Sequence, residues 1–229
     1  MSTEKNKKES APIAVDTFFV RIQKWYESNQ KKINYLTTAV LVVAVLVVLY
    51  FTMWRPNRQK KAELAIFKAE QYFAQDSMQL ALNGDGVYEG LLDVISTYPC
   101  TKTGNRAKYE AGICYLRMGD FDNAIKYLKK FKGKDKLVSV NALGAIGDAY
   151  AEKSDWNSAY SYYQKASKIH PNDLLTPTYL YRAGLSCEKL GKWAAAEDIY
   201  TTLQHEYPAS YEAMDIDKRI AYAKAKQGK

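Results

Sequence analysis

The sequence lacks the residues and motifs on which most enzyme active sites depend. It has only two histidines, His170 and His205, and each lies close to a proline, where a surface or capping role is common. It contains no phosphate-binding Walker loop, no GxSxG or HExxH motif and no dinucleotide-binding fingerprint. Residues 83–86 (NGDG) lack the other ligands of a calcium-binding loop and are expected to form a turn. We therefore expect no catalytic activity, metal site or cofactor; a hydrolase with an unrecognised site is the remaining enzymatic alternative.

Cysteine is scarce as well. Cys100, Cys114 and Cys187 are odd in number and have no short paired spacing, which argues against a disulfide framework and against a zinc site. Cys114 and Cys187 fall within apolar helical patterns, and we expect both to be small, buried side chains.

Long runs of like charge are missing. The formal net charge is +8, but acidic and basic residues are interspersed, and no nucleic-acid-binding signature occurs. This pattern is typical of a solvated surface and argues against a nucleic-acid partner.

One long segment lacks formal charge altogether. Residues 33–54 read INYLTTAVLVVAVLVVLYFTMW, a run of 22 residues between a Lys-Lys pair and Arg55. About 20 apolar residues cross the hydrocarbon core of a bilayer as a helix, and aromatic residues at both ends suit the headgroup level. No small residues mark a cleavage site after the run. The run predicts one uncleaved transmembrane helix.

The orientation of this helix follows less directly from charge, because both flanks are basic. A short, lysine-rich tail is retained in the cytoplasm more easily than it crosses, whereas large domains translocate regardless of charge. We predict a cytoplasmic tail (residues 1–32), whose first 12 residues are polar and expected to be disordered, and a remainder (residues 55–229) on the other face.

The tail contains an apolar stripe just before the predicted span. Its residues follow the spacing of one helix face: Phe18, Phe19, Ile22, Trp25 and Tyr26. Such an amphipathic helix is typical of a segment lying in the membrane interface, in contact with lipid. Docking against another membrane protein is the alternative interpretation.

Three segments of the remaining chain align with one another: residues 105–130, 140–165 and 177–202. In this alignment the shared positions are glycine (Gly112, Gly147, Gly184), aromatic (Phe121, Trp156, Trp193) and alanine (Ala124, Ala159, Ala196). In each segment a first helix is expected to end in a tight turn, followed at once by a second helix. Small residues would let the two helices approach closely, and the pairs must stack to bury their apolar faces.

This pattern resembles the tetratricopeptide repeat, a helix–turn–helix unit of about 34 residues. It predicts an all-α fold: a single transmembrane helix (33–54) followed by an α-solenoid of tetratricopeptide-like helix pairs. Residues 55–104 are expected to form a degenerate first repeat, with a long helix over 60–82 and a second helix over 87–98. Residues 105–210 form the three clear repeats. Residues 211–229 form a capping helix, apolar at Met214, Ile216, Ile220 and Ala223.

Stacked pairs of this type form a groove lined by their first helices. The positions that resemble groove residues in the family are Arg106, Tyr109, Ile113, Leu116, Arg117, Asn141, Asp148, Glu152, Thr178, Tyr181, Arg182, Leu185, Glu188 and Lys189. Chaperone-binding members use a Lys/Asn/Arg clamp for a terminal carboxylate, and of the corresponding positions only Arg182 matches. The resemblance therefore implies an extended peptide or a partner helix as ligand. Packing of Tyr109, Ile113 and Leu185 against neighbouring helices is an equally open interpretation.

The order of these parts resembles the YfgM-like family of bacterial inner-membrane proteins, which also has a Phe-Phe pair shortly before the span, as Phe18-Phe19 stand here. The segments ALNGDG (81–86) and TKTGNRAKYEAG (101–112) are similar to repeat proteins of Bacteroidetes. The resemblance implies an inner-membrane scaffold that links the SecYEG translocon to periplasmic chaperones. A coordinator of envelope assembly or cell division with the same architecture is the alternative.

Overall fold

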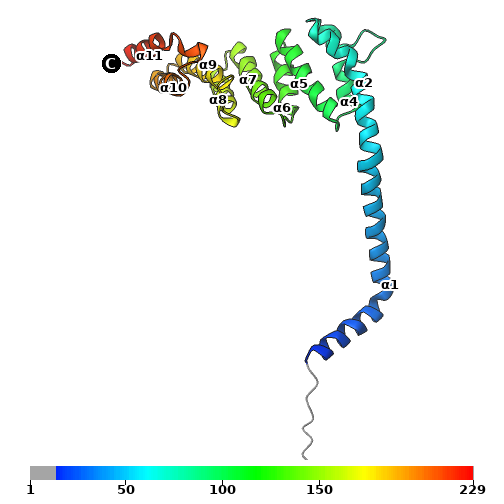
Figure 1. Ribbon diagram of the computed structural model, residues 1–229. Coiled ribbons are helices and arrows are strands. Elements are labelled where there is room, and N and C mark those ends of the chain that lie inside the picture. Colours follow the sequence, from blue (N-terminus) through cyan, green and yellow to red (C-terminus); the bar gives the residue numbers. More distant parts are fainter. Residues whose placement is uncertain (1–13, 229) are drawn as a thin grey trace, which may run out of the picture. The chain divides into compact units, whose positions relative to one another are not determined.

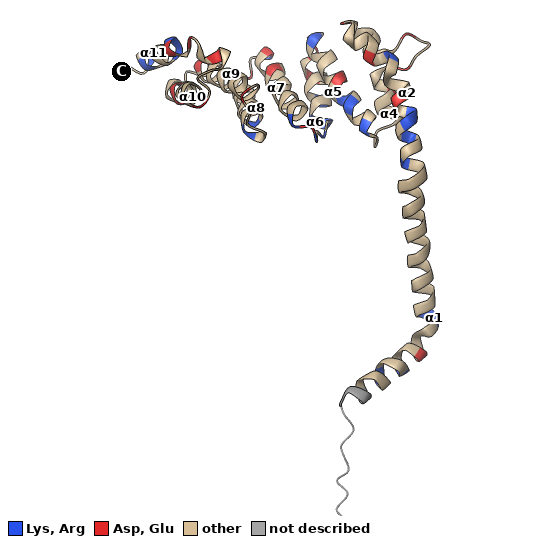
Figure 2. Ribbon diagram, in the orientation of Figure 1, with Lys and Arg blue, Asp and Glu red and all other residues tan. Residues whose placement is uncertain are grey.

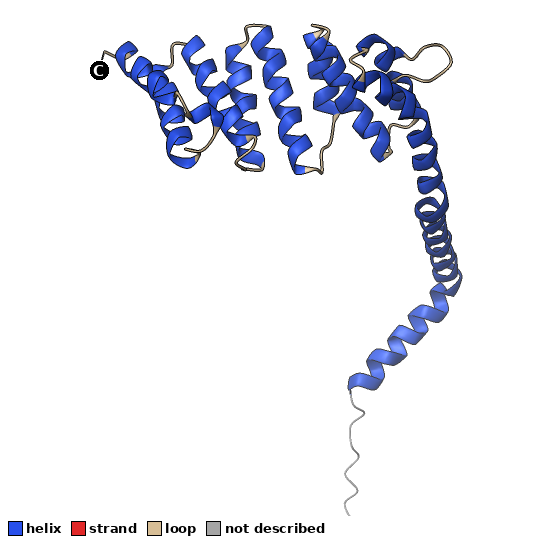
Figure 3. Cartoon of the chain, turned by 45° about the horizontal axis from the view of Figure 1, so that its top comes forward, coloured by secondary structure: helices blue, strands red, loops and turns tan. Residues whose placement is uncertain are grey.

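The computed structural model describes residues 14–228, with side chains described from Phe18 onward. The predicted disorder of residues 1–12 lies outside this range. Within the described residues every regular element is a helix (Figure 3). The chain divides after Pro56 into two compact units, and each is described by itself.

The first unit is dominated by one long helix. The amphipathic segment and most of the uncharged run belong to α1 (Ala14–Leu49), and the run ends in the π-helical turn η1 (Tyr50–Trp54). The described large apolar side chains from Leu36 to Trp54 are exposed, and Figure 2 shows this part of the helix without charge. The helical segment Phe18–Ala74 is long and apolar enough to cross a membrane. Lipid would cover the apolar surface that the protein itself leaves open.

Two irregularities mark the ends of the uncharged part. Before it, α1 bends (Figure 1), and the side chains of Ser28 and Asn29 both donate hydrogen bonds to the Trp25 carbonyl, at 2.9 and 3.0 Å. Such back-bonding is typical of bent helices. After it, η1 precedes Pro56, which cannot donate to the carbonyl four residues earlier and crowds it. A widened turn at this point relieves that conflict.

The second unit is a row of packed helices. The three clear repeats are the pairs α5 (Lys102–Arg117) and α6 (Phe121–Lys130), α7 (Lys136–Glu152) and α8 (Trp156–Ile169), and α9 (Thr176–Lys189) and α10 (Trp193–Glu206). Figure 1 shows the pairs following one another along the unit. Ahead of them lie α2 (Arg55–Ala74), α3 (Met78–Asn83) and α4 (Leu91–Thr97), and after them η2 (Tyr211–Ala213) and α11 (Ile216–Lys226).

The aligned glycines set the close approach of the two helices in each repeat. A Cβ at Gly112 would lie 2.5 Å from the Leu128 side chain, and one at Gly147 would lie 2.6 Å from the Tyr163 ring. Gly184 stands in the same relation to Tyr200. At each of these glycines, a side chain from the second helix of the same repeat occupies the space that a Cβ would need. The predicted role of the glycines, which is to let the paired helices approach closely, is therefore confirmed.

The turns between paired helices share one hydrogen-bond pattern. Gly119, Ser154 and Gly191 have φ values of 81°, 60° and 68°, in the left-handed region. In each case the next N–H returns to a carbonyl five residues back, at 2.9 Å. This is the Schellman arrangement that ends a helix. Asp120 and Asp155 then cap the second helices by accepting N–H bonds.

The same turn reveals the first repeat. Asp76 has φ 59°, and the Ser77 N–H bonds to the Tyr72 carbonyl at 2.9 Å. Counted from this turn, Ala69 takes the place of the aligned glycines, and Ala81 that of the aligned alanines; both are fully buried. The prediction of one long helix over residues 60–82 was therefore wrong: the first helix ends at Ala74, and α3 begins the second.

A loop of seven residues, 84–90, interrupts that second helix. The Asp85 carboxylate accepts hydrogen bonds from the N–H groups of Val87 and Tyr88 and from the Tyr72 hydroxyl, at 2.7–2.9 Å. Because these bonds hold Val87 and Tyr88 in a turn, the predicted start of a helix at Val87 was wrong, and α4 begins at Leu91. The loop also explains why Asp76 precedes Gly119 by 43 residues, while the later turns are 35 and 37 residues apart.

The C-terminal segment covers the last pair. Ile216, Ile220 and Ala223 of α11 join a buried cluster with Cys187, Tyr200 and Leu203. Met214 is 74% exposed, because the chain turns before α11 begins, so its predicted place on the apolar face was wrong. Cys114 and Cys187 are fully buried, as predicted, and Cys100 is exposed.

Candidate partner-binding groove

All fourteen predicted groove residues lie on α5, α7 and α9, the first helices of the three clear repeats. Four of them, Arg106, Arg117, Glu152 and Lys189, are exposed, and the other ten are half-buried. We call this set the first-helix face. Many of its polar side chains bond to one another or to neighbouring helices, a feature that the sequence pattern did not indicate.

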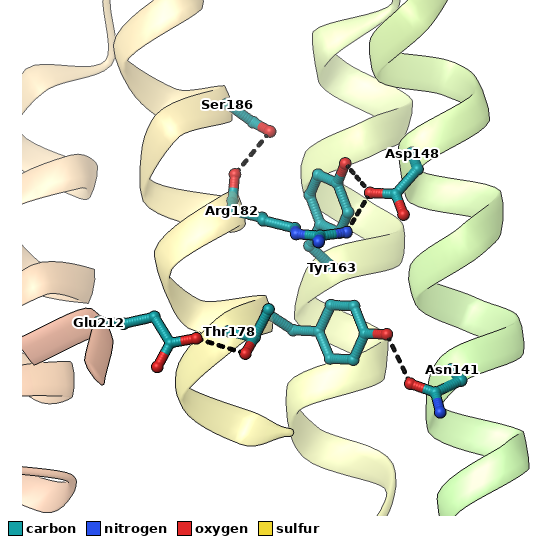
Figure 4. Close-up of polar contacts among 8 residues, drawn as sticks. Asn141, Asp148, Tyr163, Thr178, Arg182, Ser186 and Glu212 are labelled. Carbon is teal, nitrogen blue, oxygen red and sulfur yellow. Dashed lines mark hydrogen bonds and ion pairs between the residues drawn. The ribbon is translucent and has the colours of Figure 1, made fainter. Parts of the chain in front are cut away.

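A group of hydrogen bonds on the first-helix face joins α7 to α8 and α9. The Asp148 carboxylate accepts hydrogen bonds from Arg182, at 2.5 Å, and from the Tyr163 hydroxyl, at 2.7 Å (Figure 4). The Tyr179 hydroxyl donates to the Asn141 side chain at 2.9 Å. Burial, followed by the nearby Asp148 charge, raises the pKa of Tyr179 to about 12, so this hydroxyl remains a donor at neutral pH. These bonds fix the spacing between the α7–α8 pair and the α9–α10 pair.

Further links join α9 to the C-terminal segment. The Glu188 carboxylate accepts from Arg219 at 3.1 Å and from the Tyr200 hydroxyl at 2.8 Å. Thr178 donates to Glu212 at 2.5 Å, and Figure 4 shows this pair reaching from α9 toward the following segment. Predicted groove residues therefore also hold the cap in place.

Ion pairs also link α5 to the first repeat. Arg106 lies 2.5 Å from Glu70 and 3.7 Å from Glu110, and Arg117 lies 2.7 Å from Asp76. Glu110 is buried, and one of its carboxylate oxygens has no hydrogen-bond partner. Burial, and next the Glu70 carboxylate, raise the pKa of Glu110 to about 7, although Arg106 opposes the shift.

Between these linked regions the first-helix face is apolar. Tyr109, Ile113 and Leu116 of α5 are half-buried and pack against the cluster around Ile125 and Ile146. Packing accounts for the buried part of these side chains, and the remainder is accessible. Both interpretations drawn from the sequence therefore apply to them, and the partner-binding role stays a prediction.

A hollow of about 400 Å³ lies where α9 meets the C-terminal segment. Tyr181 lines it together with Arg219, Lys218 and two side chains that are largely exposed, Tyr211 (83%) and Met214 (74%). Of these residues, only Tyr181 was among the predicted groove residues. Met214 was predicted to lie on the buried side of the cap.

The predicted membrane-interface stripe is exposed throughout. Phe18, Phe19 and Trp25 are each 62% exposed, and Ile22 and Tyr26 are 46% and 45% exposed. The helix therefore presents them together, and their contact with lipid stays a prediction.

The helix pairs, their glycine contacts and their shared turns define an all-α repeat protein. Residues 106–135 and 178–210 match one family model described as tetratricopeptide repeat, and residues 142–175 match a second model with the same description. These ranges coincide with the three clear pairs and confirm the predicted fold class. Tetratricopeptide repeats generally mediate protein–protein interactions and are typically non-enzymatic.

A stretch of 103 residues, 43% of this chain, is 32% identical to "Uncharacterized protein ycf37" of Guillardia theta. The match covers 56% of that protein, so the chain spans little more than half of its length. The resemblance to the YfgM-like family remains a prediction from the order of the parts.

Proposed function

We propose that the chain is a membrane-anchored scaffold whose first-helix face binds a segment of a partner protein. The observation that carries this proposal is the accessible apolar patch of Tyr109, Ile113 and Leu116 between two ion-paired regions. An extended peptide or a helix could bury apolar side chains on this patch and pair its polar groups with the charged borders. The links to neighbouring helices keep the face rigid, which lowers the entropy cost of binding.

The uncharged helix supplies the anchor. A single span without intramembrane charge offers no path for an ion or a solute, so tethering is the role that suits it. We propose a single-pass protein of the bacterial inner membrane, with residues 1–32 in the cytoplasm and the repeats in the periplasm. The lysine-rich tail and the size of the repeat unit support this orientation.

We propose partners at the SecYEG translocon and among periplasmic chaperones. Support comes from the order of the parts: a Phe-Phe pair in the tail, one span, and tetratricopeptide-like repeats. A role in envelope assembly or cell division would use the same architecture with other partners, and the identity of bound proteins separates the two.

Site-specific cross-linking in membranes tests the scaffold. A photoreactive amino acid replaces Ile113 on the first-helix face, and in a matched control it replaces Lys126, an exposed residue of α6. We expect a defined partner to cross-link at position 113 and not at 126, and Ile113→Asp to abolish its co-purification. Equal cross-linking at both positions, or none at 113, would contradict the scaffold; recovery of neither translocon subunits nor chaperones would contradict only the proposed partners.

A reporter fused after Lys229 tests the orientation. An enzyme that is active only outside the cytoplasm should be active in this fusion. A cytoplasmic readout would contradict the periplasmic assignment while leaving the scaffold proposal intact.

A further inference from the structure

A second recess lies among α6, α7 and α8, and its lining includes none of the residues of the first-helix face. Its volume is about 370 Å³; α6 and α8 form its walls, and α7 forms its floor. A neighbouring hollow of about 480 Å³ shares Leu143, Lys165 and Ile169 with it, so the two hollows adjoin each other. Leu143 is two residues from Asn141, which places it on the opposite side of α7 from the predicted groove. We call these two adjoining hollows together the α6–α8 cleft.

The floor of the α6–α8 cleft is apolar. Leu143 and Ile146 of α7 line it, with Leu128 on the α6 side. Ile169, at the end of α8, is 46% exposed although it lines both hollows. An apolar surface in a recess of this size is typical of a site that receives a side chain of a ligand or partner.

The rim of the cleft is basic. Lys129 comes from α6, and Lys165 and Lys168 come from α8. Among the described residues, no carboxylate forms an ion pair with any of these three lysines, whereas Lys153 and Lys218 each pair with an aspartate. In the described part of the chain, the three rim lysines therefore carry positive charge without a carboxylate ion-pair partner.

Two of the lysines are held in position by stacked tyrosines. Tyr150 and Tyr162 stack with their ring centroids 5.5 Å apart. Lys129 donates a hydrogen bond to the Tyr150 hydroxyl at 2.8 Å, and Lys165 lies 4.7 Å from the centroid of the Tyr162 ring. Fixed cations lose less side-chain entropy on binding an anion than mobile ones do.

We propose that the α6–α8 cleft binds an acidic amphipathic segment of a partner protein, with an apolar side chain on the floor and carboxylates against Lys129, Lys165 and Lys168. The basic rim is complementary to the acidic face of such a segment, and the apolar floor is complementary to its apolar face. A flat membrane surface would leave the recess empty. Another copy of this chain is a poor source, because its net charge is +8. This surface is separate from the first-helix face and does not depend on the proposed function.

Binding of a designed peptide to the full-length protein in detergent micelles tests the cleft. The probe is a fluorescently labelled amphipathic helical peptide of about four turns, with leucines on one face and glutamates beside them. Fluorescence anisotropy should give a Kd on the order of 10 μM. A control peptide with glutamine in place of every glutamate should bind at least about tenfold more weakly.

Two variants address the cleft directly. Lys165→Glu with Lys168→Glu should weaken binding of the acidic peptide about tenfold or more, and Ile169→Gln should weaken it without any change in charge. The matched control is Lys126→Glu with Lys130→Glu, which makes the same change of charge on exposed α6 residues that do not line the cleft. This control should weaken binding no more than about twofold.

Three results would overturn the proposal. The first is absence of peptide binding to the wild-type protein. The second is an equal loss in the cleft and control double variants, which would indicate unspecific charge attraction. The third is binding to phosphatidylglycerol vesicles that depends on Lys165 and Lys168 while the peptide does not compete, which would indicate a lipid site. Circular dichroism of each variant checks that the helices are retained.

Discussion

At the scale of single residues, the turn between α7 and α8 contains a strained position. Ser154 adopts a left-handed backbone conformation where the neighbouring repeats have Gly119 and Gly191. A side chain in this region costs about 1–2 kcal/mol, and glycine avoids that cost at the expense of greater freedom in the unfolded chain. The turn between α7 and α8 therefore has the same backbone conformation as the other turns, but a residue that is less favourable in it than glycine.

We expect Ser154→Gly to stabilise the protein by roughly 0.5–1 kcal/mol. The reverse change, Gly119→Ser, should destabilise it by a similar amount, because it introduces the same strain. Urea unfolding of the full-length protein in detergent, followed by circular dichroism, measures both. A loss of stability in Ser154→Gly would show that its side chain contributes more than the strain costs.

A second prediction at this scale concerns Glu110, whose pKa in the folded protein is about 7, above its ordinary value of 4.5. Between these two pH values the folded chain holds a proton that the unfolded chain releases. The free energy of unfolding should therefore fall as the pH rises through this window and level off above it. Glutamine has no such proton, so Glu110→Gln should be more stable than wild type at pH 8, on the order of 1–3 kcal/mol, and equal to it at the acid end.

Unfolding curves of both proteins across this pH range measure the effect. Glu89→Gln, at an exposed position, is the control and should follow the wild-type curve. Parallel curves for wild type and Glu110→Gln would mean that Glu110 ionises normally in the folded protein.

At the scale of elements, α1 combines two surfaces that need different neighbours. Its uncharged part presents apolar side chains on all sides, whereas its first part has one apolar stripe and an opposite face that includes Lys24. A bend before the uncharged part suits a helix that leaves the plane of the interface and enters the bilayer.

Depth measurements test the stripe. In a Cys100→Ser background, an environment-sensitive fluorophore is attached to Ile22→Cys or, as the matched control, to Lys24→Cys. Cys114 and Cys187 should not react, because burial raises the pKa values of their thiols to about 12 and about 11. In lipid vesicles, we expect brominated lipids to quench the label at position 22 more strongly than at 24; equal quenching would argue against an interfacial helix.

The sequence predicted those elements whose boundaries depend on local chemistry. The three clear repeats followed from small and aromatic residues at a fixed spacing. The first repeat was harder to recognise, because Asp76 adopts a left-handed turn without glycine and the Asp85 loop interrupts the second helix. For the candidate groove, the helical period indicated which residues share the first-helix face. It could not indicate that Asp148 bonds to Arg182, or that Glu188 bonds to Arg219, because both pairs join different helices.

At the scale of the whole molecule, a repeat array is stabilised mainly between neighbours, so its ends need protection. In the C-terminal repeat, α11 covers Tyr200 and Leu203 with Ile216, Ile220 and Ala223. The links from Glu188 to Arg219 and from Thr178 to Glu212 attach the same segment. The cap is therefore part of the fold of α9 and α10.

Ile220→Asp should loosen this end, because it places a charge in the buried contact, at a cost on the order of 3 kcal/mol. Ala221→Asp, on the exposed side of the same helix, is the control. Hydrogen exchange followed by mass spectrometry should show lower protection in α9, α10 and α11 of the Ile220 variant, with α5 and α6 little changed. A uniform decrease along the repeat unit would instead indicate that it unfolds as one cooperative block.

The loop of residues 84–90, which contains Asp85, determines where another domain can be inserted into this molecule. Its ends, Gly84 and Gly90, lie so close together that a Cβ on either would collide with the backbone of the other side. Gly86, by contrast, has open space around it. The spacing between the helices on either side of the loop is therefore set by the approach of these two glycines and not by the residues between them. A fluorescent protein or an affinity module inserted after Gly86 would leave the solenoid register intact and make this turn a natural graft point.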